Sequence, residues 1–262
     1  MTNDKILASK RDGIGSLVFN HPEKRNALSP DMALAAADAI EDFAQDANVR
    51  VIVLSGAGDK AFVSGGDISR FEAERATPEQ MAEYSRKSAR FRTALIGVGK
   101  PTIAMIRGYC LGGGLAVALN CDLRFCAEDS QFGIPAARLG IGYGAERLTQ
   151  LVHLVGPSVA KDILFSGRRL NAPEALRVGL VNQVMAASAL ADHVDKYAAT
   201  LVANAPLSII ASKRVIDEIV KDAQDRNRAL CEKVIADCFA SQDYIEGRRA
   251  FMEKRKPAFT GS

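Results

Sequence analysis

The sequence predicts an α/β fold with one main domain and a helical C-terminal region. Two observations support this prediction. Short apolar, β-branched segments alternate with helical patterns over the first half of the chain, and from Ala145 onward the pattern is almost entirely helical. Strands that alternate with helices are typical of βαβ units and an α/β core. We place a boundary near Ala205, so that residues 1–204 form the core and residues 205–262 form the helical region.

The first elements can be placed from local signals. Residues Ile14 to Phe19 have the pattern of a strand, which ends in the turn His21-Pro22-Glu23. The sequence Ser29-Pro30-Asp31 then has the signature of a helix start, with serine at the N-cap, proline at the first helical position and an acid in the first turn. The alanine-rich segment from Met32 to Phe43 continues this helix.

Two apolar runs predict further strands, one from Val51 to Leu54 and one from Thr102 to Ile106. An amphipathic helix from about Glu79 to Ile96 lies between them. Later helix boundaries are indicated by glycine, asparagine and proline, namely at Gly156-Pro157, Asn171-Ala172-Pro173 and Asn204-Ala205-Pro206.

Composition excludes several classes of protein. Of the 262 residues, 48% are hydrophobic and 25% are charged, so a sizeable core is expected and disorder is not. The net charge of +3 is too small to favour binding to nucleic acid or a membrane surface. The polar N-terminal stretch MTNDKILASKRDG lacks the apolar region of a signal peptide, and no apolar run approaches bilayer length. We therefore expect a cytoplasmic protein.

Cysteine and histidine do not indicate a metal site or a nucleophile. The five cysteines fit no zinc-binding spacing, and Cys121 and Cys126 lie in the apolar stretch CDLRFC, where buried reduced thiols are expected. The three histidines are far apart in the sequence, and none lies beside an obvious nucleophile. Metal catalysis and a Ser/His/Asp triad are both disfavoured, and we expect no metal.

Two glycine-rich segments have a pattern that carries chemistry. One is AFVSGGDI, residues 61–68, where a buried strand gives way to glycines before a helix start, and the other is GYCLGGG, residues 108–114, followed by a helical run. A helix that opens on glycines offers free backbone N–H groups and a positive dipole end. Two such segments facing one point could hold a single oxygen, as in an oxyanion hole, although glycine turns are more often structural.

Five segments together resemble the crotonase, or enoyl-CoA hydratase/isomerase, family. They are HPEKRNALS, AFVSGGDI, GYCLGGGLAVALNCD, QFGIP and SGRRLNAPEALRVGLVNQV, and the tail pattern EGRRAFMEKRKP agrees as well. The resemblance covers nearly the whole chain. It implies a crotonase-like spiral of ββα turns with a C-terminal helical region, assembled as a homotrimer or a dimer of trimers. It also implies an acyl-CoA thioester substrate, with coenzyme A as part of the substrate and no separate cofactor.

The resemblance also assigns site residues by position. The thioester oxygen would be held by the backbone N–H groups of Gly66 and Gly113. The loop from Lys24 to Leu28 and the segment from Gly66 to Ser69 would bind coenzyme A. Phe251 and Lys254 in the tail would approach it, either within the same chain or from a neighbouring subunit. The substrate-binding residues implied are Lys24, Arg25, Ala27, Leu28, Ser64, Gly66, Asp67, Ile68, Ser69, Gly113, Phe251 and Lys254.

The resemblance has one important departure. The hydratases of the family place one glutamate just inside the helix after the glycine run and another after the proline of QFGxP. This sequence has Ala116 and Ala136 at those positions. Water addition needs a base for the water and an acid for the α-carbon, and alanine supplies neither. Each acid–base contribution is about 10²- to 10⁴-fold in rate, so efficient hydration would need other residues.

Tyr143 is the first candidate for the missing acid–base role, because its phenol can donate a proton or orient a substrate carboxylate. The alternative for Tyr143 is packing at a helix start. Glu146 could supply a carboxylate, but a first-turn acid that favours the helix dipole is the simpler interpretation. We expect Asp67 to cap a short helix at Ile68, and Arg138 to be a surface residue rather than a contact for a substrate anion.

Three functions follow from these residues. By family default the protein is a 2-enoyl-CoA hydratase, a lyase of fatty-acid or related acyl-CoA metabolism, with non-standard acid and base residues. The alternative is a decarboxylase for malonyl- or methylmalonyl-type thioesters, which needs the enolate hole but no strong base. The third is a CoA-binding protein without activity, which would keep Gly66 and Gly113 but turn over no thioester.

Overall fold

The structure is a computed structural model that describes residues 4–67 and 76–262. It contains a six-stranded sheet of order β1-β2-β3-β5-β7-β10 and a four-stranded sheet of order β4-β6-β8-β9. The strands are β1 (Ile6–Arg11), β2 (Ile14–Phe19), β3 (Val51–Gly56), β4 (Ala61–Val63), β5 (Thr102–Ile106), β6 (Tyr109–Leu111), β7 (Leu123–Ala127), β8 (Gln131–Gly133), β9 (Leu170–Asn171) and β10 (Gln183–Met185). The α-helices are α1 (Pro30–Gln45), α3 (Pro78–Gly97), α4 (Gly113–Leu119), α5 (Ala145–Ser166), α6 (Ala172–Arg177), α7 (Leu190–Ala203), α8 (Pro206–Ile219), α9 (Arg228–Ala240) and α10 (Gln242–Met252). The short 3-10 helices of the described chain are η1 (Pro22–Lys24), η3 (Pro135–Leu139) and η4 (Ala223–Asp225).

The core repeats one unit of structure. Strands β3, β5 and β7 lie in the larger sheet, and each is followed by a partner in the smaller sheet, namely β4, β6 and β8. The next α-helix along the described chain is α3, α4 or α5, respectively. Within each sheet these strands pair in parallel, as expected when the chain crosses over through helices. The predicted α/β spiral of ββα turns is therefore confirmed.

The central strands of the larger sheet are buried on both faces. Along β3, Ile52 and Leu54 belong to one hydrophobic core and Val51 and Val53 belong to another. This alternation explains why the sequence shows a continuous apolar run rather than an alternating one. Helix α7 packs on the second face with Val194 and other apolar residues, whereas α1 and α3 contribute to the first core.

The sequence predictions for individual elements are largely confirmed. The strand Ile14 to Phe19 has the predicted ends, and Ser29 caps α1 by accepting a hydrogen bond from the N–H of Met32. The strand from Thr102 to Ile106 also has the predicted ends. The Gly156-Pro157 boundary is a break inside α5, where Gly156 has φ of 73°. Across the part of the chain that the structure describes, the helices are too short or too polar to cross a bilayer.

Two short strands, which were not predicted, interrupt the mostly helical second half of the described chain. Strand β9 pairs antiparallel with β8, and β10 pairs parallel with β7. Segments of two or three residues are too short to show any periodicity, and their strand character comes from their partners in the sheet.

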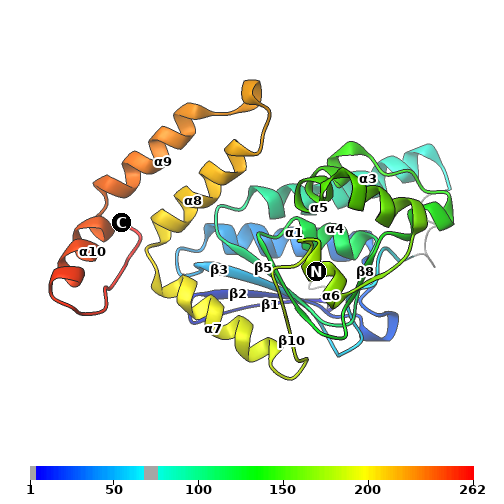
Figure 1. Ribbon diagram of the computed structural model, residues 1–262, viewed down its shortest axis with the longest axis horizontal. Coiled ribbons are helices and arrows are strands. Elements are labelled where there is room, and N and C mark those ends of the chain that lie inside the picture. Colours follow the sequence, from blue (N-terminus) through cyan, green and yellow to red (C-terminus); the bar gives the residue numbers. More distant parts are fainter. Residues whose placement is uncertain (1–3, 68–75) are drawn as a thin grey trace.

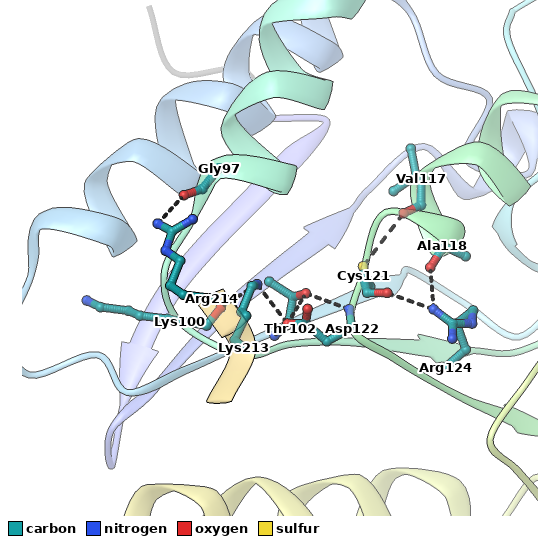
Figure 2. A network of polar contacts seen from close by, with 10 residues as sticks. All are labelled: Gly97, Lys100, Thr102, Val117, Ala118, Cys121, Asp122, Arg124, Lys213 and Arg214. Atoms are coloured by element: carbon teal, nitrogen blue, oxygen red, sulfur yellow. Dashed lines mark hydrogen bonds and ion pairs between the residues drawn. The ribbon is translucent and has the colours of Figure 1, made fainter. Parts of the chain in front are cut away.

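The three C-terminal helices α8 to α10 extend away from the two-sheet body (Figure 1). Polar contacts of α8 connect these helices to the body. The ammonium group of Lys213 on α8 lies 2.8 Å from the carboxylate of Asp122, which also accepts hydrogen bonds from the N–H and hydroxyl of Thr102 on β5 (Figure 2). Arg214 donates to the carbonyl of Gly97 at the end of α3 (Figure 2). The division between residues 1–204 and 205–262 stays a prediction, and α8 begins at Pro206.

We expect Lys213→Met to lower the free energy of unfolding by about 2–3 kcal/mol. Only 9% of the Lys213 side chain is exposed, and its loss leaves the Asp122 carboxylate without its cation. Removing one partner of a fully buried pair costs about 3–5 kcal/mol, and the 31% exposure of Asp122 reduces this value. Urea unfolding at fixed protein concentration measures the change.

The matched control is Lys233→Met, which removes the same charge from α9, where Lys233 forms an exposed pair with Asp237. Its free energy of unfolding should change by less than about 1 kcal/mol, as is usual for exposed pairs. Equal stability of the two variants would contradict an anchoring role for Lys213.

Candidate active site

The structure brings the two glycine segments together. A Cβ atom placed on Gly113 would lie 3.6 Å from the amide nitrogen of Gly66, so the end of β4 and the start of α4 are in contact. Glycine at position 114 permits this approach, because a Cβ atom there would lie only 2.0 Å from the carbonyl oxygen of Val63. The neighbouring Gly112 has φ of 52°, a conformation that favours glycine, and forms the N-cap of α4.

The amide groups at these two positions are available to a ligand. Among the described residues, neither the Gly66 N–H nor the Gly113 N–H donates a hydrogen bond to another part of the chain. Gly113 is the first residue of α4, where the helix leaves its amides unsatisfied. The amide of Gly112 differs, because it donates to the carbonyl of Gly133 on β8 and so fixes the loop to the smaller sheet.

The segment from Lys24 to Leu28 lies against the Gly66 segment. Leu28 N–H donates to the carbonyl of Gly65, and Asp67 N–H donates to the carbonyl of Leu28. Ser64 N–H donates to the carbonyl of Arg25. The predicted binding residues Lys24, Arg25, Ala27, Leu28, Ser64 and Asp67 therefore lie on one pair of hydrogen-bonded segments.

Asp67 has a defined partner in the structure. Its carboxylate is buried and lies 2.9 Å from the ammonium group of Lys24, which ties the first segment to the second. The short helix that we expected Asp67 to cap would begin at Ile68. Ile68 and Ser69 lie outside the described residues, so that expectation stays a prediction.

Asn26 has a structural role that was not predicted from the sequence. It is fully buried and has a left-handed backbone with φ of 55°. Its side-chain oxygen accepts from the N–H of His21, and its side-chain nitrogen donates to the carbonyls of Ala57 and Ala61. Asparagine adopts this backbone region more readily than most residues, which is the one sequence-level signal for its role. Asn26 thus holds the predicted coenzyme A loop to the residue after β3 and to the first residue of β4.

We expect Asn26→Asp to reduce the free energy of unfolding by about 2–4 kcal/mol, because a carboxylate oxygen would then face the carbonyl oxygens of Ala57 and Ala61 without a proton between them. The exposed control Asn204→Asp should cost less than about 1 kcal/mol. Urea unfolding compares the two variants. A stability equal to that of the control would mean that these hydrogen bonds contribute little.

A cavity of about 170 Å³ lies beside the glycine pair. Its wall is formed by α1, α3 and α4, by the segment around η3, and by the start of α5, and most of the lining is apolar. The described polar side chains in the wall are Ser64, Tyr84, Ser88, Arg92, Asn120, Tyr143 and Arg147. No described residue of the wall carries a carboxylate, an imidazole or a thiol.

Ala116 and Ala136 both line this cavity. Ala116 lies in the first turn of α4 and Ala136 lies in η3, on separate turns of the spiral. Both side chains are methyl groups and offer no group for proton transfer.

Tyr143 also lines the cavity. Its hydroxyl oxygen lies 3.9 Å from the point where a Cβ atom on Gly112 would be, and Gly112 directly precedes Gly113 in the chain. The guanidinium carbon of Arg147 lies 6.0 Å from the centre of the Tyr143 ring. Glu146 is not part of the cavity wall. Its carboxylate lies close to Gly144 at the start of α5, and 54% of its side chain is exposed. Arg138 is exposed, as expected.

The cysteines of the core are buried reduced thiols, as predicted. Burial raises the pKa of Cys121 and of Cys126 to about 12, and the thiolate that would act as a nucleophile is thereby disfavoured. The cavity wall contains neither of them among the described residues.

The tail residues Phe251 and Lys254 do not line the cavity of this chain. Phe251 lies near the end of α10 with 82% of its surface exposed, and Lys254 is also exposed. Helix α10 belongs to the group of helices that extends away from the body (Figure 1).

Comparison with known proteins gives a consistent result. The family described as Enoyl-CoA hydratase/isomerase matches residues 9–262. The chain is 34% identical over 259 residues to the crotonyl-CoA hydratase of Syntrophomonas wolfei, with 99% of each chain covered. It is 33% identical over 256 residues to the short-chain-enoyl-CoA hydratase of Clostridium acetobutylicum, covering 98% of this chain and 97% of that one. The crystal structure of an enoyl-CoA hydratase/carnithine racemase from Magnetospirillum magneticum superposes with a TM-score of 0.95 at 33% identity, covering 100% of this chain and 97% of the other.

Proposed function

Since the chain belongs to the enoyl-CoA hydratase/isomerase family, a family of acyl-CoA enzymes, we propose that it is a lyase that adds water to a 2-enoyl-CoA thioester or removes it from the hydrated product. One observation carries the proposal. The amides of Gly66 and Gly113, on adjacent segments beside a mainly apolar cavity, donate to no other described residue. Two N–H groups of this kind stabilise the negative charge that develops on a thioester oxygen.

The reaction proceeds through an enolate. Water attacks the β-carbon, and the electron pair of the α,β double bond moves so that negative charge collects on the thioester oxygen. The two amides stabilise this charge more strongly in the transition state than in the substrate, which lowers the barrier. A proton then joins the α-carbon, and the attacking water loses a proton, so that the product is the 3-hydroxyacyl thioester.

Tyr143 is the residue that we assign to proton transfer. Its phenol lines the cavity beside the Gly112–Gly113 turn, so it can donate a proton to the α-carbon and recover one from the attacking water. The resemblance predicts glutamates where Ala116 and Ala136 stand. Loss of two acid–base groups would raise the barrier by about 5–11 kcal/mol if their effects multiplied, so a substitute is required.

Decarboxylation of a malonyl-type thioester is the second candidate. The absence of any described carboxylate or imidazole in the cavity wall favours it, because this reaction needs no base. The carbon–carbon bond to the carboxylate breaks, carbon dioxide leaves, and the electron pair remains on the α-carbon as the enolate in the same oxyanion hole. Tyr143 would then protonate the α-carbon.

A panel of thioesters separates these functions. Hydration of crotonyl-CoA, followed by the loss of absorbance of the conjugated thioester, would support the first proposal. Release of carbon dioxide from malonyl-CoA or methylmalonyl-CoA would overturn it in favour of the second. Tight binding of coenzyme A without turnover of any thioester would contradict both and indicate a binding protein without activity.

The binding of coenzyme A and the assembly of subunits belong to this proposal. Coenzyme A enters as part of the substrate and contacts Lys24, Arg25 and the adjoining Gly66 segment, and Phe251 and Lys254 approach it from a neighbouring subunit. Exposed apolar residues on the helices α8, α9 and α10 support a homotrimer or a dimer of trimers, because such surfaces are usually covered by a partner. They include Ile216, Ile219, Val220, Ile235, Phe239, Phe251 and Met252. A cytoplasmic location stays a prediction from the sequence.

A further inference from the structure

Two arginines in the cavity wall have no role in the chemistry proposed above. Arg92 comes from the last part of α3 and Arg147 from the first turn of α5, and both line the same mainly apolar cavity as the glycine pair. Their side chains are 28% and 35% exposed, so each side chain is partly buried. A neutral hydrocarbon chain would not need either group.

The charge of the arginine pair is only partly compensated within the described residues. Glu146 is the one acidic partner there, and a single carboxylate oxygen lies 3.9 Å from a nitrogen of Arg92 and 3.9 Å from a nitrogen of Arg147. These separations are longer than hydrogen bonds. Neither guanidinium donates a hydrogen bond to the described part of the chain, so two positive charges share one distant negative charge at the cavity.

An anion in the cavity would complete this arrangement. A guanidinium has donors in a planar fork that matches a carboxylate, and the contact is stronger in an apolar cavity than in water. A neutral alkyl chain placed there would instead remove water from the two guanidinium groups and return no hydrogen bond. That loss selects against uncharged acyl groups.

We propose that the acyl group of the substrate carries a free carboxylate in addition to its thioester, and that Arg92 and Arg147 bind this carboxylate. The substrate class is therefore the coenzyme A thioester of a dicarboxylic acid. The proposal rests on the proposed function, because it takes the thioester to lie with its oxygen at Gly66 and Gly113. In hydration the bound carboxylate stays in the product, whereas in the decarboxylation of a malonyl-type thioester it is the group that leaves as carbon dioxide.

The test compares saturated thioesters that differ only at the end of the chain. Glutaryl-CoA has a carboxylate where pentanoyl-CoA has a methyl group, and succinyl-CoA and butyryl-CoA form a shorter pair. None of them has the double bond that hydration needs, so calorimetry measures binding alone. We expect the dicarboxylic member of at least one pair to bind about 10- to 100-fold more tightly, as charge-assisted hydrogen bonds predict.

Two variants test whether Arg92 and Arg147 cause this preference. Arg92→Met and Arg147→Met should each reduce it to less than about threefold, while the affinity for pentanoyl-CoA stays within about threefold of the original. The control Arg86→Met removes an exposed arginine of the same helix, paired with Glu83, and should leave the preference intact. Circular dichroism checks that the variants are folded.

Each result has one meaning. Equal affinity for the two members of both pairs would overturn this proposal and leave the proposed function standing. A preference that persists in both Arg92→Met and Arg147→Met would also overturn it, because the selectivity would then come from elsewhere. Failure of all four thioesters to bind would overturn the proposed function and this proposal together.

Discussion

Replacing Gly113 with proline is expected to lower kcat for the thioester substrate by about 10²- to 10³-fold, the usual cost of losing one oxyanion donor. Proline has no N–H, and its ring would occupy the space in front of the former amide. Gly113 is the first residue of α4, a position where helices accept proline, so the variant should fold. Because the charge on the oxygen develops in the transition state, kcat should fall more than the affinity for substrate.

The matched control is Gly113→Ala, which adds a methyl group and keeps the N–H. The new Cβ atom would lie 3.6 Å from the amide nitrogen of Gly66 and 3.7 Å from the carbonyl carbon of Gly65, both ordinary contacts. We therefore expect this variant to lose less than about tenfold in kcat. Steady-state kinetics with a matched melting temperature checks both substitutions. Full activity of the proline variant would contradict the assignment of the oxyanion hole.

The parts of the fold that were predictable are those with signals inside one segment. The strand from Thr102 to Ile106 is a continuous apolar run introduced by a proline, and the start of α1 has a serine cap followed by proline. The burial of alternate residues of β3 in two cores explains why such runs mark strands here. Strands β9 and β10 could not be predicted, because only their pairing with β8 and β7 makes them strands.

The residues of the candidate site also divide into those with a signal in their own segment and those whose position depends on packing. Gly66 and Gly113 lie in glycine segments that are visible in the sequence, and the loop from Lys24 to Leu28 was expected beside them. Arg92 and Arg147 were not expected, because an arginine on an amphipathic helix has the same sequence pattern whether it faces solvent or a cavity. Their proximity depends on how α3 and α5 pack, which no local pattern encodes.

The ion pair between Asp67 and Lys24 is another example of a long-range feature. A single acid after two glycines is typical of a helix cap, and that interpretation uses only adjacent residues. The structure adds a feature that adjacent residues do not indicate, because the buried carboxylate joins segments 43 positions apart in the sequence. Asn26 has the same character, since its three hydrogen-bond partners lie on different segments.

The substitution Tyr143→Phe tests the source of the proton. It removes one hydroxyl group and keeps the aromatic ring beside Arg147. We expect kcat to fall by about 10²- to 10⁴-fold, because no other described residue of the cavity wall is a carboxylate, imidazole or thiol that could transfer a proton in its place. The binding of saturated acyl-CoA thioesters should change by less than about threefold, since the phenol acts in the transition state and not in the ground state.

Two further substitutions make this expectation specific to Tyr143. Tyr84→Phe removes the hydroxyl of the other tyrosine in the cavity wall, which comes from α3, and should reduce kcat by less than about tenfold. Glu146→Gln removes the exposed carboxylate at the start of α5 and should also leave kcat within about tenfold. If Glu146→Gln were inactive and Tyr143→Phe fully active, the proton would come from the carboxylate of Glu146, and α5 would have to move that group into the cavity during turnover.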